Sequence, residues 1–125
     1  MQFVLIIYTD PALLDALRAG EGDAMMRDCL SHADELRHAG RLLESRMLAQ
    51  PATAKIVRRR QGRLSVVDGP FAEAKELVGG FNLIEAKDMD EAIEIAATFP
   101  WTRTGCVEIR PVQDMEEVRR RVQTA

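Results

Sequence analysis

The stretch VDGPFAEAKELVGGF at residues 67–81 decides how the rest of the chain is organised. It holds the end of a β-favouring run, a Gly-Pro break, alternating charges and a double glycine directly before a second apolar run. Asp, Gly and Pro in succession are typical of a turn, and a double glycine at a strand start indicates a bend or a close approach of backbone. The stretch therefore predicts a loop between two strands, and we expect the remaining elements to hold this loop over a cavity.

Composition indicates one domain over residues 1–125. With 46% hydrophobic and 30% charged residues, a chain of 125 residues can bury one core. The net charge of -3 argues against nucleic acid as a partner, because phosphate binding needs a surplus of Lys and Arg on one face. We interpret the arginine clusters at residues 58–60 and 119–121 as solvated surface. The apolar run at residues 3–8 is too short to span a membrane and has no basic leader, so we expect a cytoplasmic protein without membrane association.

The first half of the chain predicts a strand, a helix and a second strand. Residues 3–8 are apolar on both faces, which favours a central strand. Residues 23–39 carry apolar side chains at steps of three and four, with Asp23 as the expected N-cap and Gly40 as the stop. Residues 41–48 favour the second strand.

A hairpin is predicted next. The β-rich segments at residues 53–60 and 63–68 flank Gln61-Gly62, which is the composition of a tight turn. A two-residue turn sets Lys55 opposite Asp68 and brings the pair close to the loop, whereas a longer turn would break this register.

A second strand–helix–strand unit and a terminal helix complete the chain. Residues 78–86 favour a strand, and the capping box Asp88-Met89-Asp90-Glu91 predicts a helix in which Asp88 accepts from backbone N–H groups while Glu91 reaches back. Residues 105–112 alternate, with Val107 and Ile109 on one face and Cys106, Glu108 and Arg110 on the other. A second capping box at residues 114–117 starts the last helix.

This order predicts a ferredoxin-like α+β fold, βαββαβ, with an extra hairpin and a C-terminal helix. Helices on one side of an antiparallel sheet leave the other side uncovered. Because the strand at residues 3–8 is apolar on both faces, a second copy of the chain is the expected cover. We therefore expect a homodimer with its two sheets face to face.

The motifs at residues 68–76, 79–81 and 107–111 resemble the signature of the DGPF proteins, a branch of the YCII-related family. Leu36, Gly40, Pro51 and Thr53 stand at fitting positions. The resemblance implies a dimeric α+β barrel, and it implies a link of some bacterial members to extracytoplasmic-function sigma factors, which makes a sigma factor a candidate partner.

The resemblance also implies a His-Asp dyad in YCII-type relatives, with the His in the first helix and the Asp before a proline after the second helix. Aligned on residues 40–43 and 100–105, this chain has Cys29 and Phe99 at those two positions, so the dyad is not carried over. His32 lies one turn from Cys29 and is a candidate substitute. Asp28, His32 and Glu35 share one rim of the helix, which fits either a proton-transfer pair or an exposed helix pair.

The candidate site consists of charged residues from the loop and the last strand, with Tyr8 at the end of the central strand. Asp68 and Glu73 are the candidate bases, together with His32, and Lys75 and Arg110 are candidate holders of a small anionic ligand. Tyr8 and Glu108 are expected to contact the substrate. The alternative interpretation is structural, with Asp68 in a turn and Lys75, Glu76, Glu108 and Arg110 in ion pairs or dimer contacts.

Three function classes remain open. The first is a cofactor-independent lyase or isomerase acting on a small acid, the second a ligand-binding or regulatory module, and the third a structural dimer without a small-molecule site. Cys29 and Cys106 have no metal-ligand spacing and are expected to be buried thiols, and no phosphate-binding glycine loop or nucleophile elbow is present, so no cofactor or metal is predicted.

Overall fold

A computed structural model describes residues 1–71 and 75–123. The elements in chain order are β1 (Gln2–Thr9), α1 (Pro11–Asp15), α2 (Glu21–His38), β2 (Leu42–Met47), η1 (Pro51–Thr53), β3 (Lys55–Arg60), β4 (Arg63–Asp68), β5 (Leu77–Glu85), α3 (Met89–Ala97), η2 (Pro100–Arg103), β6 (Gly105–Pro111) and α4 (Met115–Gln123), where η marks a short 3₁₀ helix. Four strands form an antiparallel sheet in the order β2-β5-β1-β6, and β3 and β4 form a separate hairpin. The predicted ferredoxin-like α+β fold is confirmed.

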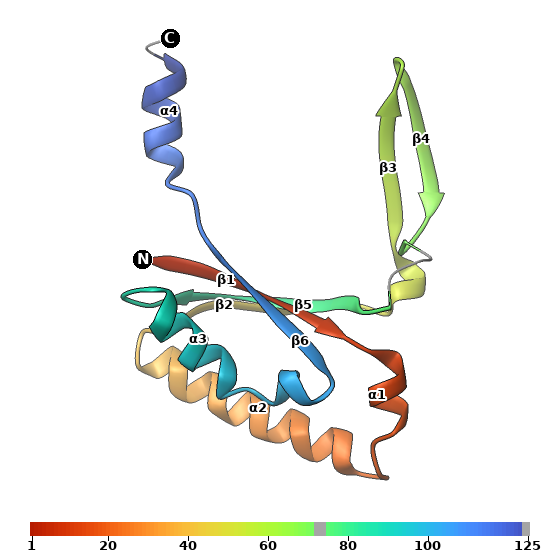
Figure 1. The fold of residues 1–125 in the computed structure, drawn as a ribbon, viewed down its shortest axis with the longest axis vertical. Coiled ribbons are helices and arrows are strands. Elements are labelled where there is room, and N and C mark those ends of the chain that lie inside the picture. The colour runs from red at the N-terminus through yellow and green to blue at the C-terminus, as the bar shows by residue number, and fades with distance from the viewer. Residues whose placement is uncertain (72–74, 124–125) are drawn as a thin grey trace.

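One face of the sheet is covered by α2 and α3 (Figure 1). Alternate residues of β1, namely Phe3, Leu5 and Ile7, are buried on this face. They pack with buried residues of the two helices and of β5, among them Ala33 and Ile84. The period of two in β1 therefore divides its apolar run between a core face and a second face.

The second face of the sheet has no helix over it. Val4, Ile6 and Tyr8 of β1 are half-buried there. Their register partners on β5 and β6 share this face, including Phe81, Leu83, Glu108 and Arg110. The uncovered face is thus apolar along its centre and charged along β6, as the alternation of residues 105–112 predicts.

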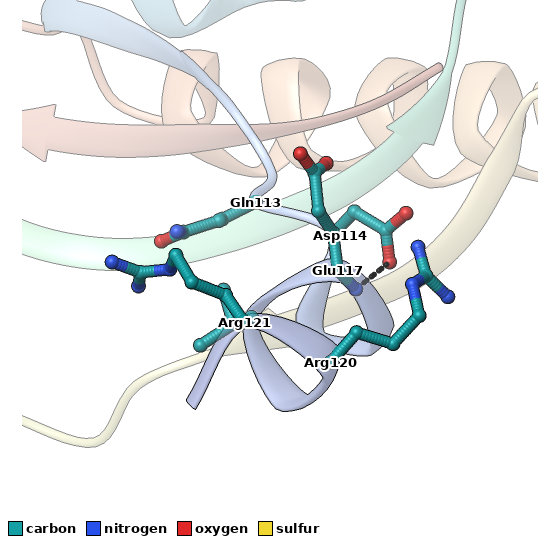
Figure 2. Close-up of a pocket in the computed structure, with 6 residues that line it drawn as sticks. Gln113, Asp114, Glu117, Arg120 and Arg121 are labelled. Carbon is teal, nitrogen blue, oxygen red and sulfur yellow. Dashed lines mark hydrogen bonds between the residues drawn. The ribbon is translucent and has the colours of Figure 1, made fainter. Parts of the chain in front are cut away.

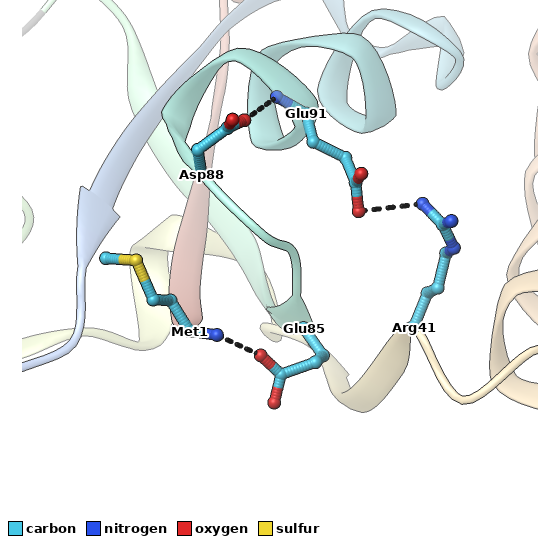
Figure 3. A network of polar contacts seen from close by, with 5 residues as sticks. All are labelled: Met1, Arg41, Glu85, Asp88 and Glu91. Carbon is cyan, nitrogen blue, oxygen red and sulfur yellow. Dashed lines mark hydrogen bonds and ion pairs between the residues drawn. The ribbon is translucent and has the colours of Figure 1, made fainter.

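Two helix starts differ in part from the sequence prediction. α2 begins at Glu21 after Gly20, whose positive φ of 81° suits a residue without Cβ, so Asp23 lies in the first turn and is not the N-cap. At α3, Asp88 caps as predicted and accepts from the Glu91 backbone N–H at 2.9 Å. The Glu91 carboxylate does not reach back but accepts from the Arg41 guanidinium at 2.9 Å, because Arg41 before β2 is a stronger donor than the helix backbone (Figure 3).

The β3–β4 hairpin has the predicted register. Lys55 lies opposite Asp68 and Arg60 opposite Arg63, and the Lys55 ammonium pairs with the Asp68 carboxylate. The hairpin and α4 both project from the uncovered side of the sheet, away from α2 and α3, at opposite ends of the molecule (Figure 1).

Two glycines allow strands to approach closely. A Cβ on Gly80 would lie 2.6 Å from the carbonyl oxygen of Arg46 on β2, which explains the second glycine of the Gly79-Gly80 pair. A Cβ on Gly105 would lie 1.9 Å from the carbonyl oxygen of Tyr8. Among the described residues, no helix has the length and apolar character needed to cross a bilayer.

Candidate functional site

A cavity of about 800 Å³ lies between α2 and the helix-covered face of the sheet. Its lining comes from α1, α2, the ends of β1, β2 and β5, and the segment from Phe99 to Thr104. We call it the α2 cavity. It lies on the opposite side of the sheet from Glu108 and Arg110, which belong to the uncovered face.

The walls of the α2 cavity are mainly apolar. α2 contributes Met25, Met26, Cys29, Leu30 and Ala33. On the other side Phe99 and Trp101 stack with ring centroids 6.4 Å apart and planes at 18°. Burial raises the pKa of the Cys29 thiol, so the thiol remains protonated at neutral pH and acts as an apolar wall group.

The sheet supplies a polar floor to this apolar space. Asn82 on β5 and Ser45 on β2 are register partners, and both line the cavity. Asn82 is only 3% exposed, yet within residues 1–71 and 75–123 its amide makes no side-chain hydrogen bond. Among the described residues, the one fully buried side-chain N or O atom without a partner is Nε1 of Trp101, so the amide atoms of Asn82 are not fully enclosed and face the accessible space of the cavity. A buried amide facing a cavity is therefore the group most suited to receive a ligand.

Two further polar groups lie at the cavity wall. Thr104 is 2% exposed, and its carbonyl accepts from the backbone N–H of Asp10 at 2.8 Å. The indole N–H of Trp101 is buried without a hydrogen-bond partner in the described part of the chain. Together with Asn82 these groups surround an apolar space with a small number of directional polar atoms, which is the usual composition of a small-molecule site.

A separate group of polar side chains lies on the uncovered face of the sheet. We call Tyr8, Glu76, Cys106, Glu108 and Arg110 the polar cluster. The Tyr8 hydroxyl donates to the Glu108 carboxylate at 2.8 Å, and this hydrogen bond raises the pKa of Tyr8. The Glu76 carboxylate lies near the Cys106 thiol and raises the pKa of Cys106. Arg110 lies close enough to Tyr8 to oppose the rise in the pKa of Tyr8.

The structure thus brings three of the predicted site residues together, Tyr8, Glu108 and Arg110. Cys106 was expected to be buried, but it is exposed, because it points to the uncovered face of β6. The expectation of a buried thiol is confirmed for Cys29 alone.

The loop residues are placed elsewhere. Asp68 lies at the base of the hairpin in its pair with Lys55, and no hydrogen bond or ion pair joins it to the polar cluster within the described residues. Lys75 is exposed. Glu73, one of the candidate bases, lies outside the described residues.

His32 packs between α2 and the end of α3. Its Nε2 contacts the Thr98 hydroxyl at 2.5 Å, and its ring meets Phe99 edge-on at 4.9 Å. Its Nδ1 lies 3.7 Å from the Glu35 carboxylate, so these two of the three rim residues form a pair. His32 does not line the α2 cavity, but its neighbour Phe99 does.

Residues 1–116 match the model of the YCII-related domain. The chain belongs to the YCII-related family. An uncharacterised protein of Rhizobium meliloti (strain 1021) is 32% identical to this YCII-related chain over 114 residues, which cover 90% of this chain and 92% of that protein. A solved structure with a similar fold is 5-chloro-2-hydroxyhydroquinone dehydrochlorinase from Burkholderia phenoliruptrix AC1100 in complex with 2,5-dihydroxybenzoquinone, with a TM-score of 0.55, 15% identity and coverage of 94% of this chain and 98% of that one.

In this YCII-related chain, Cys29 and Phe99 stand at the two positions that the resemblance gives to the relatives' dyad, and both line the α2 cavity. The cavity was not expected from the sequence, nor were its residues Ser45, Asn82, Trp101 and Thr104. One signal was present, because Asn82 is a lone amide within the apolar run Phe81-Asn82-Leu83-Ile84 of a predicted strand.

Proposed function

We propose that the protein binds a small, mainly apolar organic molecule in the α2 cavity and holds a carbonyl or hydroxyl group of that molecule at Asn82. The observation that carries this proposal is the Asn82 amide, 3% exposed, without a side-chain hydrogen bond to the described residues, and at the floor of a cavity of about 800 Å³. A ligand that pairs with this amide gains a hydrogen bond from a residue that is otherwise surrounded by apolar core.

The cavity has the size and composition of a small-molecule site. Ligand pockets range from about 300 to 1,000 Å³ and have mostly hydrophobic walls with few polar groups. The stacked Phe99 and Trp101 rings favour a flat ring as the apolar part of the ligand. The dehydrochlorinase of similar fold is complexed with a small oxygenated ring, 2,5-dihydroxybenzoquinone, which supports the choice of ring ketones and phenols as probes.

Binding is favoured over acid–base catalysis at this cavity. The thiol of Cys29 has a raised pKa, and Asp34 at the rim is paired with Arg37 at 3.2 Å. Arg46, also at the rim, is paired with Glu44 at 2.8 Å. Among the described lining residues no imidazole is present, so shape and hydrogen bonding are what this cavity supplies.

The test is a thermal-shift screen of benzoquinones, hydroxybenzoates and phenols on the wild type and on Asn82→Leu. Gln2→Leu is a matched control, because it makes the same change of amide to alkyl at an exposed residue outside the cavity. We expect at least one probe to stabilise the wild type and Gln2→Leu but not Asn82→Leu. Equal shifts for all three proteins would remove Asn82 from the site.

A second candidate is a cofactor-independent lyase or isomerase that uses the polar cluster. The observation in its favour is that Tyr8, Glu108 and Arg110 converge, so a carboxylate, a phenol and a cation for an anionic substrate lie together. The sequence-based roles of Asp68 and Glu73 as bases stay predictions, because Asp68 lies in its pair with Lys55 and Glu73 lies outside the described residues. Turnover of small carboxylates that is lost in Arg110→Ala and in Asp68→Asn supports this candidate, whereas turnover unaffected by both variants excludes it.

We also propose that two copies pair through the uncovered face of the sheet. Val4, Ile6, Phe81 and Leu83 form the apolar centre of this face. An apolar sheet face of this kind is normally covered, and the same face of a second copy is a self-complementary cover. Sedimentation equilibrium at micromolar concentration should give the mass of a dimer, and a monomeric mass would contradict the pairing.

A further inference from the structure

The β3–β4 hairpin has an apolar face that nothing in the described chain covers. Val57 and Val66 lie opposite each other and share this face with Leu64, and the three are 57–61% exposed. The turn side of the hairpin extends well beyond the body of the protein (Figure 1). A two-stranded hairpin is marginally stable by itself, so a packing surface is required to hold it in this extended position.

At the other end of the molecule, α4 also has apolar side chains that the described chain leaves largely exposed. Met115, Val118 and Val122 recur at helical spacing and form one apolar stripe. Met115 and Val122 are 58% and 60% exposed. A hollow of about 560 Å³ lies beside this helix, and Figure 2 shows it between Gln113, Asp114, Glu117 and the two arginines Arg120 and Arg121. Val118 contributes the apolar part of its lining.

Charge determines which of these surfaces can meet. The hairpin carries five cations, Lys55, Arg58, Arg59, Arg60 and Arg63, against one carboxylate, Asp68, so its net charge is +4. Two hairpins side by side would therefore repel each other. Residues 114–123 carry three carboxylates, Asp114, Glu116 and Glu117, and three arginines at 119–121, so this segment has no net charge. It does not repel the hairpin as a second hairpin would, and its acidic start lies on the side that suits the hairpin cations.

We propose that the hairpin of one copy packs on α4 of a second copy, with Val57, Leu64 and Val66 against the Met115–Val118–Val122 stripe. This contact rests on the sheet pairing proposed above. The hairpin and α4 project from the same side of the sheet at opposite ends of the molecule, so a two-fold axis between two paired sheets can bring each hairpin beside the partner's α4 (Figure 1). The dimer then has two identical contacts between a hairpin and the partner's α4, in addition to the sheet contact. We call each of these two contacts a clasp.

The test is crosslinking between different variants, in a background where the exposed Cys106 is replaced by Ser. Chains with Val66→Cys are co-expressed with chains carrying Val118→Cys and treated with a short bismaleimide. We expect a crosslinked dimer from the mixture and none, or much less, from either variant alone. If either variant alone gives as much crosslinked dimer as the mixture, the contact is between two hairpins or between two α4 helices. That result would overturn the clasp.

Sedimentation distinguishes this proposal from the one on which it rests. If the wild type is dimeric and the mixture does not crosslink, the clasp is wrong and the sheet pairing stands. If the wild type is monomeric, both the clasp and the sheet pairing are wrong.

A second measurement is the dimer Kd of Leu64→Lys. This variant should have a Kd at least about tenfold higher and an unchanged circular dichroism spectrum, because it adds charge to a buried apolar contact. An unchanged Kd would overturn the clasp.

Discussion

Asn82 on β5 and Ser45 on β2 lie opposite each other in the sheet and both line the α2 cavity. Their neighbours along the same face, Leu5 and Ile84, are buried apolar core residues. A polar pair inside an apolar layer destabilises the free protein unless water or a ligand satisfies it. The position of this pair therefore links the stability of the fold to the occupancy of the cavity.

Replacement of Asn82 by Leu tests that link without any ligand. Leu has a similar volume and no polar group, so Asn82→Leu should raise the free energy of unfolding by about 1–2 kcal/mol. Urea denaturation followed by circular dichroism measures the change. A loss of stability of that size would show that the amide is already satisfied in the free protein, which would contradict its role as an unpaired ligand group.

The hydrogen bond between Tyr8 and Glu108 can be tested by titration. Glu108 accepts from the phenol and raises the pKa of Tyr8, so Glu108→Gln should lower that pKa towards its ordinary value. Tyr8 is the single tyrosine of the chain, so the ultraviolet absorbance of tyrosinate reports it alone. A pKa of Tyr8 that is the same in both proteins would mean that the hydrogen bond is not formed in solution.

The contact between Glu76 and Cys106 predicts a pH effect on thiol reactivity. Glu76 favours the protonated thiol and raises the pKa of Cys106, so Glu76→Gln should lower the pKa and increase the thiolate fraction at pH 8. Reaction of Cys106 with an aromatic disulfide reagent should then be a few-fold faster in Glu76→Gln, while Cys29 reacts slowly in both proteins. Identical rates for Cys106 would argue against the contact.

The close approach at Gly105 predicts a large loss of stability. In Gly105→Ala the new Cβ would lie 1.9 Å from the Tyr8 carbonyl oxygen, so β1 and β6 would have to separate. We expect the free energy of unfolding to fall by at least about 2 kcal/mol. Gly22→Ala is the control, because its new Cβ would lie 3.8 Å from the nearest atom. Replacement of a helical Gly by Ala should raise the free energy of unfolding by as much as about 1 kcal/mol. Equal effects of the two substitutions would contradict the geometry at Gly105.

Local signals in the sequence predict the fold well. The Gln61-Gly62 turn correctly sets Lys55 opposite Asp68, and the alternation of residues 105–112 correctly separates Val107 from Glu108. These features depend on neighbours along one strand or one hairpin. The exposure of Cys106 was missed because alternation separates two faces without showing that one of them has no cover.

The α2 cavity could not be predicted in the same way. Its lining is assembled from six segments that are distant in the sequence, and its volume depends on how far α2 stands from the sheet. The charged loop at residues 68–76 attracts attention in the sequence because it is polar, whereas the cavity is mainly apolar and its key polar residue, Asn82, stands alone in an apolar run. The roles predicted for Asp68, Glu73 and Lys75 remain predictions.

Isothermal titration calorimetry with the strongest probe of the thermal-shift screen tests the central claim most directly. The wild type and Gln2→Leu should bind with the same affinity, and Asn82→Leu should bind at least about tenfold more weakly, which corresponds to about 1.4 kcal/mol. Because Asn82→Leu should also be more stable than the wild type, weaker binding cannot be ascribed to unfolding. Equal affinity of all three proteins would contradict the claim that Asn82 holds the ligand in the α2 cavity.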